Sequence, residues 1–292
     1  MFNNYIIANH RIRLTGPVSD AVKAGLRGFA PFVVEPETEA DCAATILTGV
    51  DIQLPAQLEQ LTEFDFDEGD ARCTFYRNAE RYYFTIESDK QPTLILSSSR
   101  NDLSHIEMNA EEGVNPSFLR FGLWFAVNMA LSQHLTTAVH TSVIVCHGEA
   151  VMFLGESGTG KSTHTRLWRE TIEGATLLND DSPFIGINDG KVVAYGSPWS
   201  GKTPCYKAES YPLRAIVRLS QAPHNAIRRL RGAQAMGALL PSLPPAFAYD
   251  GRLEEAMIDV LSAVLSKVPV YHLECLPDTA AAQLSHDTVF GL

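Results

Sequence analysis

The segment that most constrains the fold of this chain is glycine-rich and runs from Gly155 to Thr163. It reads GESGTGKST and fits the pattern GxxxxGK[ST] at every position. An apolar, strand-forming segment (residues 150–154) precedes it, and a helix-forming segment follows it. Glycines let the backbone curl so that successive N–H groups point at one centre, and a helix that starts there adds unpaired donors and partial positive charge. The sequence therefore predicts a phosphate-binding loop between a strand and a helix.

We expect this loop to bind a nucleoside triphosphate, with ATP and Mg²⁺ as the ligands. The predicted binding residues are Gly155, Glu156, Ser157, Gly158, Thr159, Gly160, Lys161, Ser162 and Thr163. Lys161 would bridge the β- and γ-phosphates, and the Ser162 hydroxyl would ligate Mg²⁺. Thr163 is interpreted mainly as part of the first helical turn.

A second element is the apolar strand that ends in Asn179-Asp180-Asp181, about 20 residues after the loop lysine. At this position in phosphate-loop proteins an aspartate holds Mg²⁺. We therefore place Asp180 with Ser162 as metal ligands. Because adjacent carboxylates repel each other, one of the pair can instead act as a base toward an attacking hydroxyl. Both Asp180 and Asp181 are predicted catalytic residues, and the sequence leaves open which is the base.

A glycine- and proline-containing segment, residues 196–203, is predicted to form a defined loop. Its Lys202 could reach a transferring phosphoryl group, as a catalytic clamp would. The alternative is an ordinary loop with an exposed lysine. The basic residues 228–231 are interpreted as a solvated helix face.

Together these elements resemble the HPr kinase/phosphorylase family and, more loosely, the nucleotide-binding core of the phosphoenolpyruvate carboxykinases. His140 opens a strand, the loop GESGTGKST follows, and the pair Asp180-Asp181 ends the next apolar strand; the resemblance covers residues 138–205. It implies that His140 lies beside the site of phosphoryl transfer. It also implies that one aspartate binds metal while the other acts as base, and that the protein forms a homo-oligomer.

Three departures limit what the resemblance implies. The family has an acidic residue after the GKS sequence, where this chain has Thr163. The downstream stretch that reads the protein substrate is not recognisable, and the N-terminal region shows no likeness to that of the family. The acceptor is therefore not implied to be HPr.

The chain is predicted to be α/β with an α+β tendency, in two domains. Residues 1–113 are expected to form a smaller, mainly β accessory domain that binds a substrate or partner, with strands at 5–14, 41–49, 72–77, 81–88 and 93–98 and a helix at 18–29. Residues 114–292 are expected to form the phosphate-loop kinase domain. Frequent hairpins among its strands predict a mixed sheet rather than an all-parallel one. An acid-rich segment, residues 64–70, is interpreted as a solvated loop.

Net charge and cysteine content indicate which partners and which cellular compartment to expect. The net charge is −11, and residues 1–115 hold 19 of the 34 acidic side chains. This balance argues against nucleic acid or an anionic membrane as the partner. The five cysteines are dispersed, which is typical of reduced thiols. With no secretory pattern at the start and no run of about 18 apolar residues, we expect a cytoplasmic protein.

The favoured function is an ATP-dependent kinase that passes the γ-phosphoryl group to a serine-type hydroxyl in a protein, peptide or small molecule. One alternative is a regulatory or scaffold protein that holds the nucleotide without turnover. Another is a carboxykinase-like enzyme, for which the chain is short and the expected upstream metal ligands are not evident.

Overall fold

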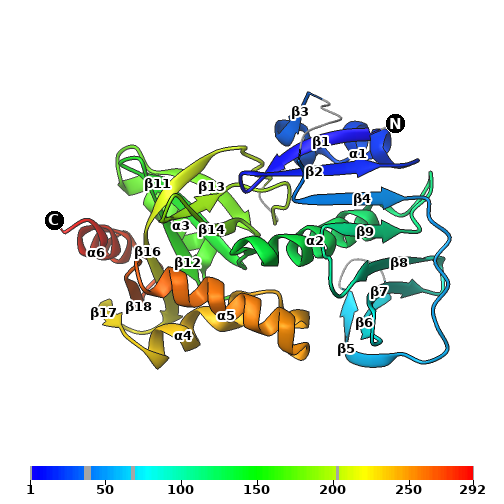
Figure 1. Cartoon of the computed structure of the whole chain (residues 1–292). Coiled ribbons are helices and arrows are strands. Elements are labelled where there is room, and N and C mark those ends of the chain that lie inside the picture. Colours follow the sequence, from blue (N-terminus) through cyan, green and yellow to red (C-terminus); the bar gives the residue numbers. More distant parts are fainter. Residues whose placement is uncertain (1, 36–40, 67–69, 202–203, 292) are drawn as a thin grey trace. The chain divides into compact units, whose positions relative to one another are not determined.

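A computed structural model describes residues 2–35, 41–66, 70–201 and 204–291. The protein is mixed α/β, with two mixed sheets (Figure 1). It divides into two compact units, residues 1–134 with 246–255, and residues 135–245 with 256–292. This division falls after His134 rather than near residue 113, because α2 (Pro116–Leu131) packs against β8 (Gln91–Ser99) of the first unit. In the described ranges, no helix is both long and apolar enough to cross a membrane.

The first unit contains a nine-stranded sheet in the order β3-β1-β2-β4-β9-β8-β7-β6-β5. Its other strands are β1 (Phe2–Ile7), β2 (His10–Thr15), β3 (Val33–Val34), β4 (Ala44–Thr48), β5 (Glu59–Phe66), β6 (Ala71–Arg77), β7 (Arg81–Ser88) and β9 (His105–Met108). The pairs β2–β4 and β4–β9 are parallel, and the other neighbours are antiparallel. The expected hairpin of residues 72–88 is present as β6 and β7.

Three expectations for this unit were wrong in detail. The segment 5–14 is a hairpin rather than one strand, since Ala8 and Asn9 take positive φ values of 50° and 66° and reverse the chain. The helix expected at 18–29 is a short helix, α1 (Ser19–Gly25), followed by a 3₁₀ segment (Arg27–Phe32). The acid-rich segment begins inside strand β5, because β6 pairs with it; its residues 67–69 lie outside the described ranges.

Helix α2 supplies the core of the first unit. The Asn115 side chain caps its start by accepting hydrogen bonds from two backbone N–H groups. Phe125 stacks on Phe84 of β7 with ring centroids 4.0 Å apart, and it meets Phe75 and Phe247 edge-on. The apolar run of residues 118–133 is therefore explained by burial.

The second unit contains the other mixed sheet. Its main path runs β10-β14-β15-β16-β12-β11-β13, with β18 beside β16 and β17 beside β18. The strands are β10 (Thr136–Ala138), β11 (Thr141–Cys146), β12 (Glu149–Leu154), β13 (Thr176–Asp181), β14 (Phe184–Asn188), β15 (Lys191–Tyr195), β16 (Ser210–Gln221), β17 (Ala226–Leu230) and β18 (Val270–Cys275). The pairs β12–β16 and β16–β18 are parallel while the rest are antiparallel. The prediction of a mixed sheet is confirmed.

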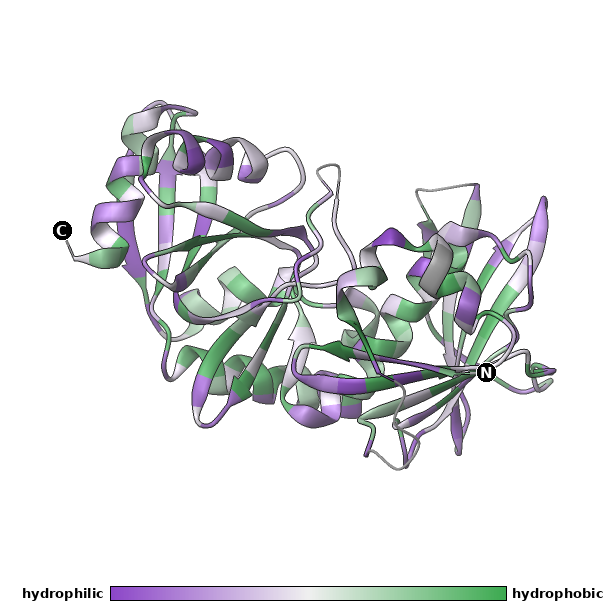
Figure 2. Cartoon of the chain, turned by 90° about the horizontal axis from the view of Figure 1, so that it is seen from above, coloured by the Kyte–Doolittle hydropathy of each residue, from purple (hydrophilic) through white to green (hydrophobic). Residues whose placement is uncertain are grey.

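Helices α3 (Lys161–Thr171) and α6 (Thr279–Phe290) pack on each other and on this sheet. The shared core holds Val151, Phe153, Val217 and Leu273 from the strands, Trp168 from α3 and Val289 from α6. Figure 2 shows hydrophobic residues running along neighbouring strands, whereas α6, which ends at the C mark, alternates in hydropathy. Strands β11 and β12 are buried along almost their whole length, so both of their faces are covered, and this explains why they are continuous apolar runs in the sequence.

Two further helices complete this part of the chain. They are α4 (Ala233–Leu239) and α5 (Gly251–Leu265), and α5 starts among the residues grouped with the first unit. Helix α6 was not expected from the sequence. The basic residues 228–231 were expected on a helix face, but β17 occupies most of this segment because it pairs with β18.

A buried carboxylate ties residues 246–255 to the sheet of the first unit. The fully buried Asp250 accepts hydrogen bonds from the Tyr82 hydroxyl and an Arg77 guanidinium N–H, each at 2.7 Å, and from the Leu253 N–H at 3.2 Å. Burial alone raises the pKa of Asp250, but these donors and the Arg77 charge outweigh burial and hold the pKa below its ordinary value. The carboxylate is therefore ionised, and its charge is compensated locally.

We predict that Asp250→Asn lowers the free energy of unfolding of the first unit by about 3 kcal/mol, because the Arg77 guanidinium loses the charge of its buried carboxylate partner. Glu59→Gln is the matched control: Glu59 pairs with the same Arg77 at the solvent-exposed side of the guanidinium, and because exposed ion pairs contribute little to stability, its effect should be much smaller. Hydrogen-exchange protection of β6 and β7 in urea measures the stability lost in each of the two variants.

The stability that the wild type gains from Asp250 should depend on pH. Because the folded-state pKa of Asp250 is depressed, this extra stability should be present above the pKa of about 3.9 that the group has in the unfolded chain. It should disappear as the pH falls through the folded pKa. Equal effects of the two substitutions would contradict this account.

Candidate functional site

The glycine loop is bent between β12 and α3. Gly158 and Gly160 have φ values of 82° and 101°, and residues other than glycine rarely adopt this backbone conformation. A Cβ on Gly155 would lie 2.4 Å from Thr159 Oγ1, so that position also requires glycine. Gly160 is the N-cap of α3, and no side chain caps this helix start. The N-terminal donors of α3 therefore face the loop without a side-chain acceptor.

Internal hydrogen bonds maintain this bend. The backbone N–H of Thr159 donates to the Glu156 carbonyl at 3.2 Å, and the Thr159 hydroxyl donates to the same oxygen at 2.8 Å. From β16, Gln221 Nε2 donates to the Gly158 carbonyl at 3.2 Å. The loop is thus a closed turn anchored to a neighbouring strand.

Lys161 turns its ammonium group back across the mouth of the loop. Its Nζ donates to the carbonyls of Gly155 at 2.7 Å and Glu156 at 3.3 Å, and lies 3.3 Å from His140 Nε2. Burial lowers the pKa of Lys161, and although Asp180 and Asp181 oppose the shift, the pKa stays below that of an ordinary lysine. A partly desolvated cation in this position favours an anionic ligand.

Asp180, at the end of β13, is buried among hydroxyl groups. Its Oδ1 accepts a hydrogen bond from the Ser142 hydroxyl of β11, and both of its oxygens lie 3.3–3.4 Å from the Ser162 hydroxyl of α3. A carboxylate and two hydroxyls from three elements make an all-oxygen donor set, which suits a hard cation such as Mg²⁺. The residues predicted as metal ligands, Ser162 and Asp180, are therefore close together and chemically suited to that ion.

Asp181 has a different environment from its neighbour. Its side chain is 39% exposed, and Oδ1 lies 3.3 Å from His140 Nδ1. The backbone at Asp181 has a φ of 125°, unusual for a residue with a side chain, and an isolated bridge to Ser200 holds it there. Because Lys161 can only donate to Nε2 of His140, the proton of the neutral ring is on Nδ1 and faces the Asp181 carboxylate.

Asn179 connects the aspartate pair to the following loop. Its fully buried side-chain amide donates to the carbonyls of Trp199 at 3.0 Å and Cys205 at 3.2 Å, and its oxygen accepts from the Ser182 N–H at 3.2 Å. The backbone N–H of Gly201 donates to the Asp180 carbonyl at 2.6 Å. The described part of segment 196–203 therefore lies against the aspartates. The predicted catalytic Lys202 lies outside the described residues.

A cavity of about 570 Å³ opens beside the glycine loop, at the ends of β16 and β18. It is lined by Gly158, Thr159, Gly160, Thr163, His164, Leu219, Gln221, Ala222, Cys275, Leu276 and Pro277. Its polar side chains are Thr159, Thr163, His164 and Gln221, and the others are apolar or glycine apart from Cys275; a few polar groups among apolar ones are typical of small-molecule pockets. Thr163, expected mainly as part of the first helical turn, also borders this cavity.

Several residues at this site were not identified from the sequence. They are Ser142, Asn179, Ser200, Gln221 and Arg218, whose guanidinium lies 3.5 Å from the Glu156 carboxylate. Asn179 adjoins the aspartate pair and Ser142 follows His140 by two positions, so proximity in sequence was an available signal for these two. Gln221 and Arg218 come from a strand whose place beside β12 depends on the fold.

Comparisons with known proteins give little further information. No family model matches the chain, and no curated protein matches its sequence. Among solved structures, the chain is similar to the HPr(Ser) kinase/phosphatase from Coxiella burnetii, with 11% identity, a TM-score of 0.31, and coverage of 53% of this chain and 93% of that one. This is a weak likeness of fold alone.

Proposed function

We propose that the second unit binds Mg²⁺ and ATP at the glycine loop and transfers the γ-phosphoryl group to a hydroxyl acceptor. The observation that carries the proposal is the convergence of five side chains at the mouth of the loop. They are His140, Lys161, Ser162, Asp180 and Asp181. Phosphoryl transfer needs a cation, oxygen ligands for Mg²⁺, and a base that is held in position. Lys161 would be the cation, Ser162 and Asp180 the metal ligands, and Asp181 the base, which the His140 imidazole orients.

The loop and Lys161 would hold the polyphosphate. The curled backbone and the uncapped start of α3 supply N–H donors, and the ammonium group of Lys161 would exchange its carbonyl partners for phosphate oxygens. The cavity beside Gly158 would take the base of the nucleotide between apolar side chains, with Gln221 as a polar contact. Mg²⁺ bound at Ser162 and Asp180 would neutralise charge on the phosphates.

Asp181 is the better candidate for the base. Asp180 is buried, and both of its oxygens are near hydroxyl groups, whereas Asp181 is partly exposed and can meet an acceptor. The acceptor oxygen would bond to the γ-phosphorus while the bond to the β–γ bridging oxygen breaks and releases ADP. The acceptor proton would pass to the Asp181 carboxylate, which His140 Nδ1–H orients.

The acceptor is a hydroxyl of the serine type, in a protein, peptide or small molecule. The exposed position of Asp181 supports an acceptor that arrives from solvent. The carboxykinase alternative, which would join phosphoryl transfer to the decarboxylation of an oxo-acid, draws no specific support from the described residues of the site.

Lys161→Ala should abolish the rise in melting temperature that Mg²⁺ and ATP produce, because the cation facing the phosphates is lost. Lys191→Ala, at the exposed start of β15, is the control and should respond as wild type does. Since burial lowers the pKa of Lys161, wild-type affinity should weaken as the pH rises through that lowered pKa, as the ammonium loses its proton. Lys161→Arg should bind ATP with less dependence on pH. A full ATP response in Lys161→Ala would exclude this loop as the binding site.

Asp181→Asn should leave ATP-induced stabilisation intact and reduce transfer by about 10²–10⁴-fold, because the proton acceptor is removed. Asp180→Asn should instead weaken the Mg²⁺ dependence of ATP binding, and Asp189→Asn, in the β14–β15 turn, serves as the control. Transfer of γ-labelled phosphate into a lysate of the source cell, with identification of the labelled species, measures the reaction. Wild-type transfer in both Asp180→Asn and Asp181→Asn would overturn the mechanism. ATP binding without transfer or turnover in the wild type would favour the regulatory alternative.

A further inference from the structure

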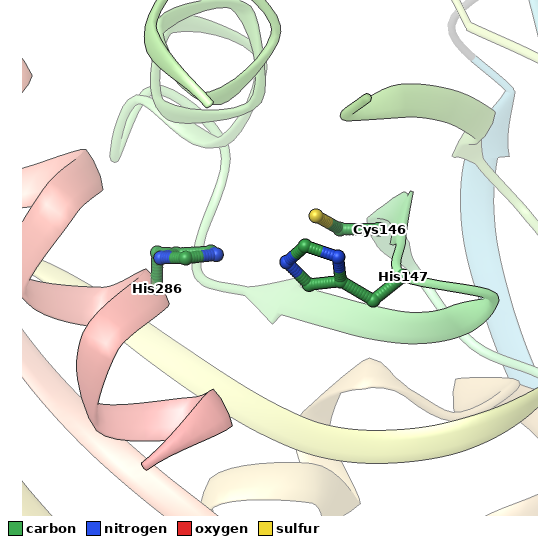
Figure 3. A group of neighbouring side chains, drawn as sticks. All are labelled: Cys146, His147 and His286. Atoms are coloured by element: carbon green, nitrogen blue, oxygen red, sulfur yellow. The ribbon is translucent and has the colours of Figure 1, made fainter. Parts of the chain in front are cut away.

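Three potential metal ligands meet at the end of β11 opposite to the candidate nucleotide site. Cys146 ends β11, His147 lies in the tight turn before β12, and His286 is on α6. One ligand atom from each residue lies within 4.8 Å of the other two. Figure 3 shows the His286 ring pointing toward the other two side chains. From His140 to Cys146 the strand spans roughly 20 Å, so this cluster is separate from the glycine loop.

His286 has an unused acceptor that points to a ligand. The residue is 6% exposed, and its Nε2 is a buried atom without a hydrogen-bond partner in the part of the chain that the structure describes. Its Nδ1 lies 3.0 Å from the carboxylate of Asp287. Because an ionised carboxylate can only accept a hydrogen bond, the ring nitrogen that faces it donates, and in the neutral ring Nε2 then keeps its lone pair. An imidazole held this way by a carboxylate is the usual support of a metal-ligating histidine.

Cys146 supplies a soft ligand beside that imidazole. The side chain is 1% exposed, and its weak contact with the Glu173 carbonyl is 4.0 Å long. A divalent metal ion binds cysteine as the thiolate. Metal binding would therefore release the thiol proton.

His147 completes the set and leaves it open to solvent. Its φ of 51° is uncommon for a residue with a side chain, and this conformation forms the two-residue turn with Gly148. The exposed ring lies 5.1 Å from the Phe290 ring and 5.7 Å from the His286 ring, between centroids. The aromatic rings of Phe290 and Trp168 also contact the His286 ring. The cluster therefore has an apolar wall on the side of His286, and His147 is its solvent-accessible ligand.

We propose that Cys146, His147 and His286 form a binding site for Zn²⁺ or a divalent cation of similar softness, with water or another ligand in the fourth position. One thiolate and two imidazoles suit such ions and do not suit Mg²⁺ or Ca²⁺. Tetrahedral zinc places its ligand atoms about 3.3–3.8 Å apart, so the present separations need only small side-chain rotations. The cation would fasten α6 to the β11–β12 turn.

This connection would extend to the helix that begins at the glycine loop. The Ser285 hydroxyl of α6 accepts a hydrogen bond from Trp168 Nε1 at 2.9 Å and lies 3.1 Å from His164 Nε2, and both of these residues belong to α3. A cation at His286 would therefore stabilise the packing of α6 against α3. The proposal does not depend on the function of the glycine loop.

The test uses the full chain after removal of metal with a chelator. Calorimetry with Zn²⁺ should show one equivalent bound per chain, with proton release and a higher melting temperature. Co²⁺ should produce the near-ultraviolet charge-transfer band of a thiolate–cobalt bond. His147→Ala should lower the affinity about tenfold or more, and this exposed position should not disturb folding.

Matched controls separate this site from adventitious binding by surface residues. His224→Ala, an exposed histidine in another turn of the same unit, and Cys42→Ser should both retain wild-type binding. Cys146→Ser and His286→Gln should lose the Co²⁺ band, with circular dichroism confirming that they fold. The proposal is overturned if the metal-free protein takes up no Zn²⁺, or if His147→Ala binds Zn²⁺ as the wild type does.

Discussion

Lys161 places a partly desolvated ammonium group over two carbonyl oxygens of the glycine loop, next to an imidazole and two carboxylates. A cation in this environment is stable only if negative charge stays close, and Asp180 and Asp181 provide it. A polyphosphate would provide more of it, together with acceptors for the free N–H donors at the start of α3. The other residues of the candidate site lie around this lysine.

The sheet brings these groups to a single edge. Strands β12, β11 and β13 are neighbours, and both pairs are antiparallel. The end of β12, the start of β11 and the end of β13 therefore coincide, which gathers the loop, His140 and the aspartates. The same geometry puts the turn at Cys146 and His147 at the opposite edge, where α6 supplies His286. One strand thus links two chemically different clusters.

Local patterns predicted much of the second unit. The glycine loop, the strand before it, the helix after it and the hairpin at residues 184–195 all carry their signals within a few residues, and the structure contains each of them. Helix α6 was missed because its small residues, such as Ala281 and Ala282, form a buried face without a strong apolar pattern. Strand β17 was missed because its pairing with β18 decides its conformation.

Long-range contacts explain most of what the sequence could not predict. Arg77 and Asp250 are distant in the chain, as are His147 and His286, and no spacing rule connects such partners. At the candidate site, the different surroundings of Asp180 and Asp181 depend on Ser142 and His140 from another strand. The sequence therefore indicated the pair but could not separate the two roles.

An NMR titration of protein labelled with ¹⁵N-glycine tests the central claim most directly. The amide signals of Gly155, Gly158 and Gly160, assigned by triple-resonance experiments, should shift on addition of Mg²⁺ and ATP, because phosphate oxygens would accept hydrogen bonds from this loop. Signals of glycines remote from the loop, such as Gly190 in the β14–β15 turn, should stay in place. Binding of ATP with unchanged loop signals, or no binding at all, would contradict the account.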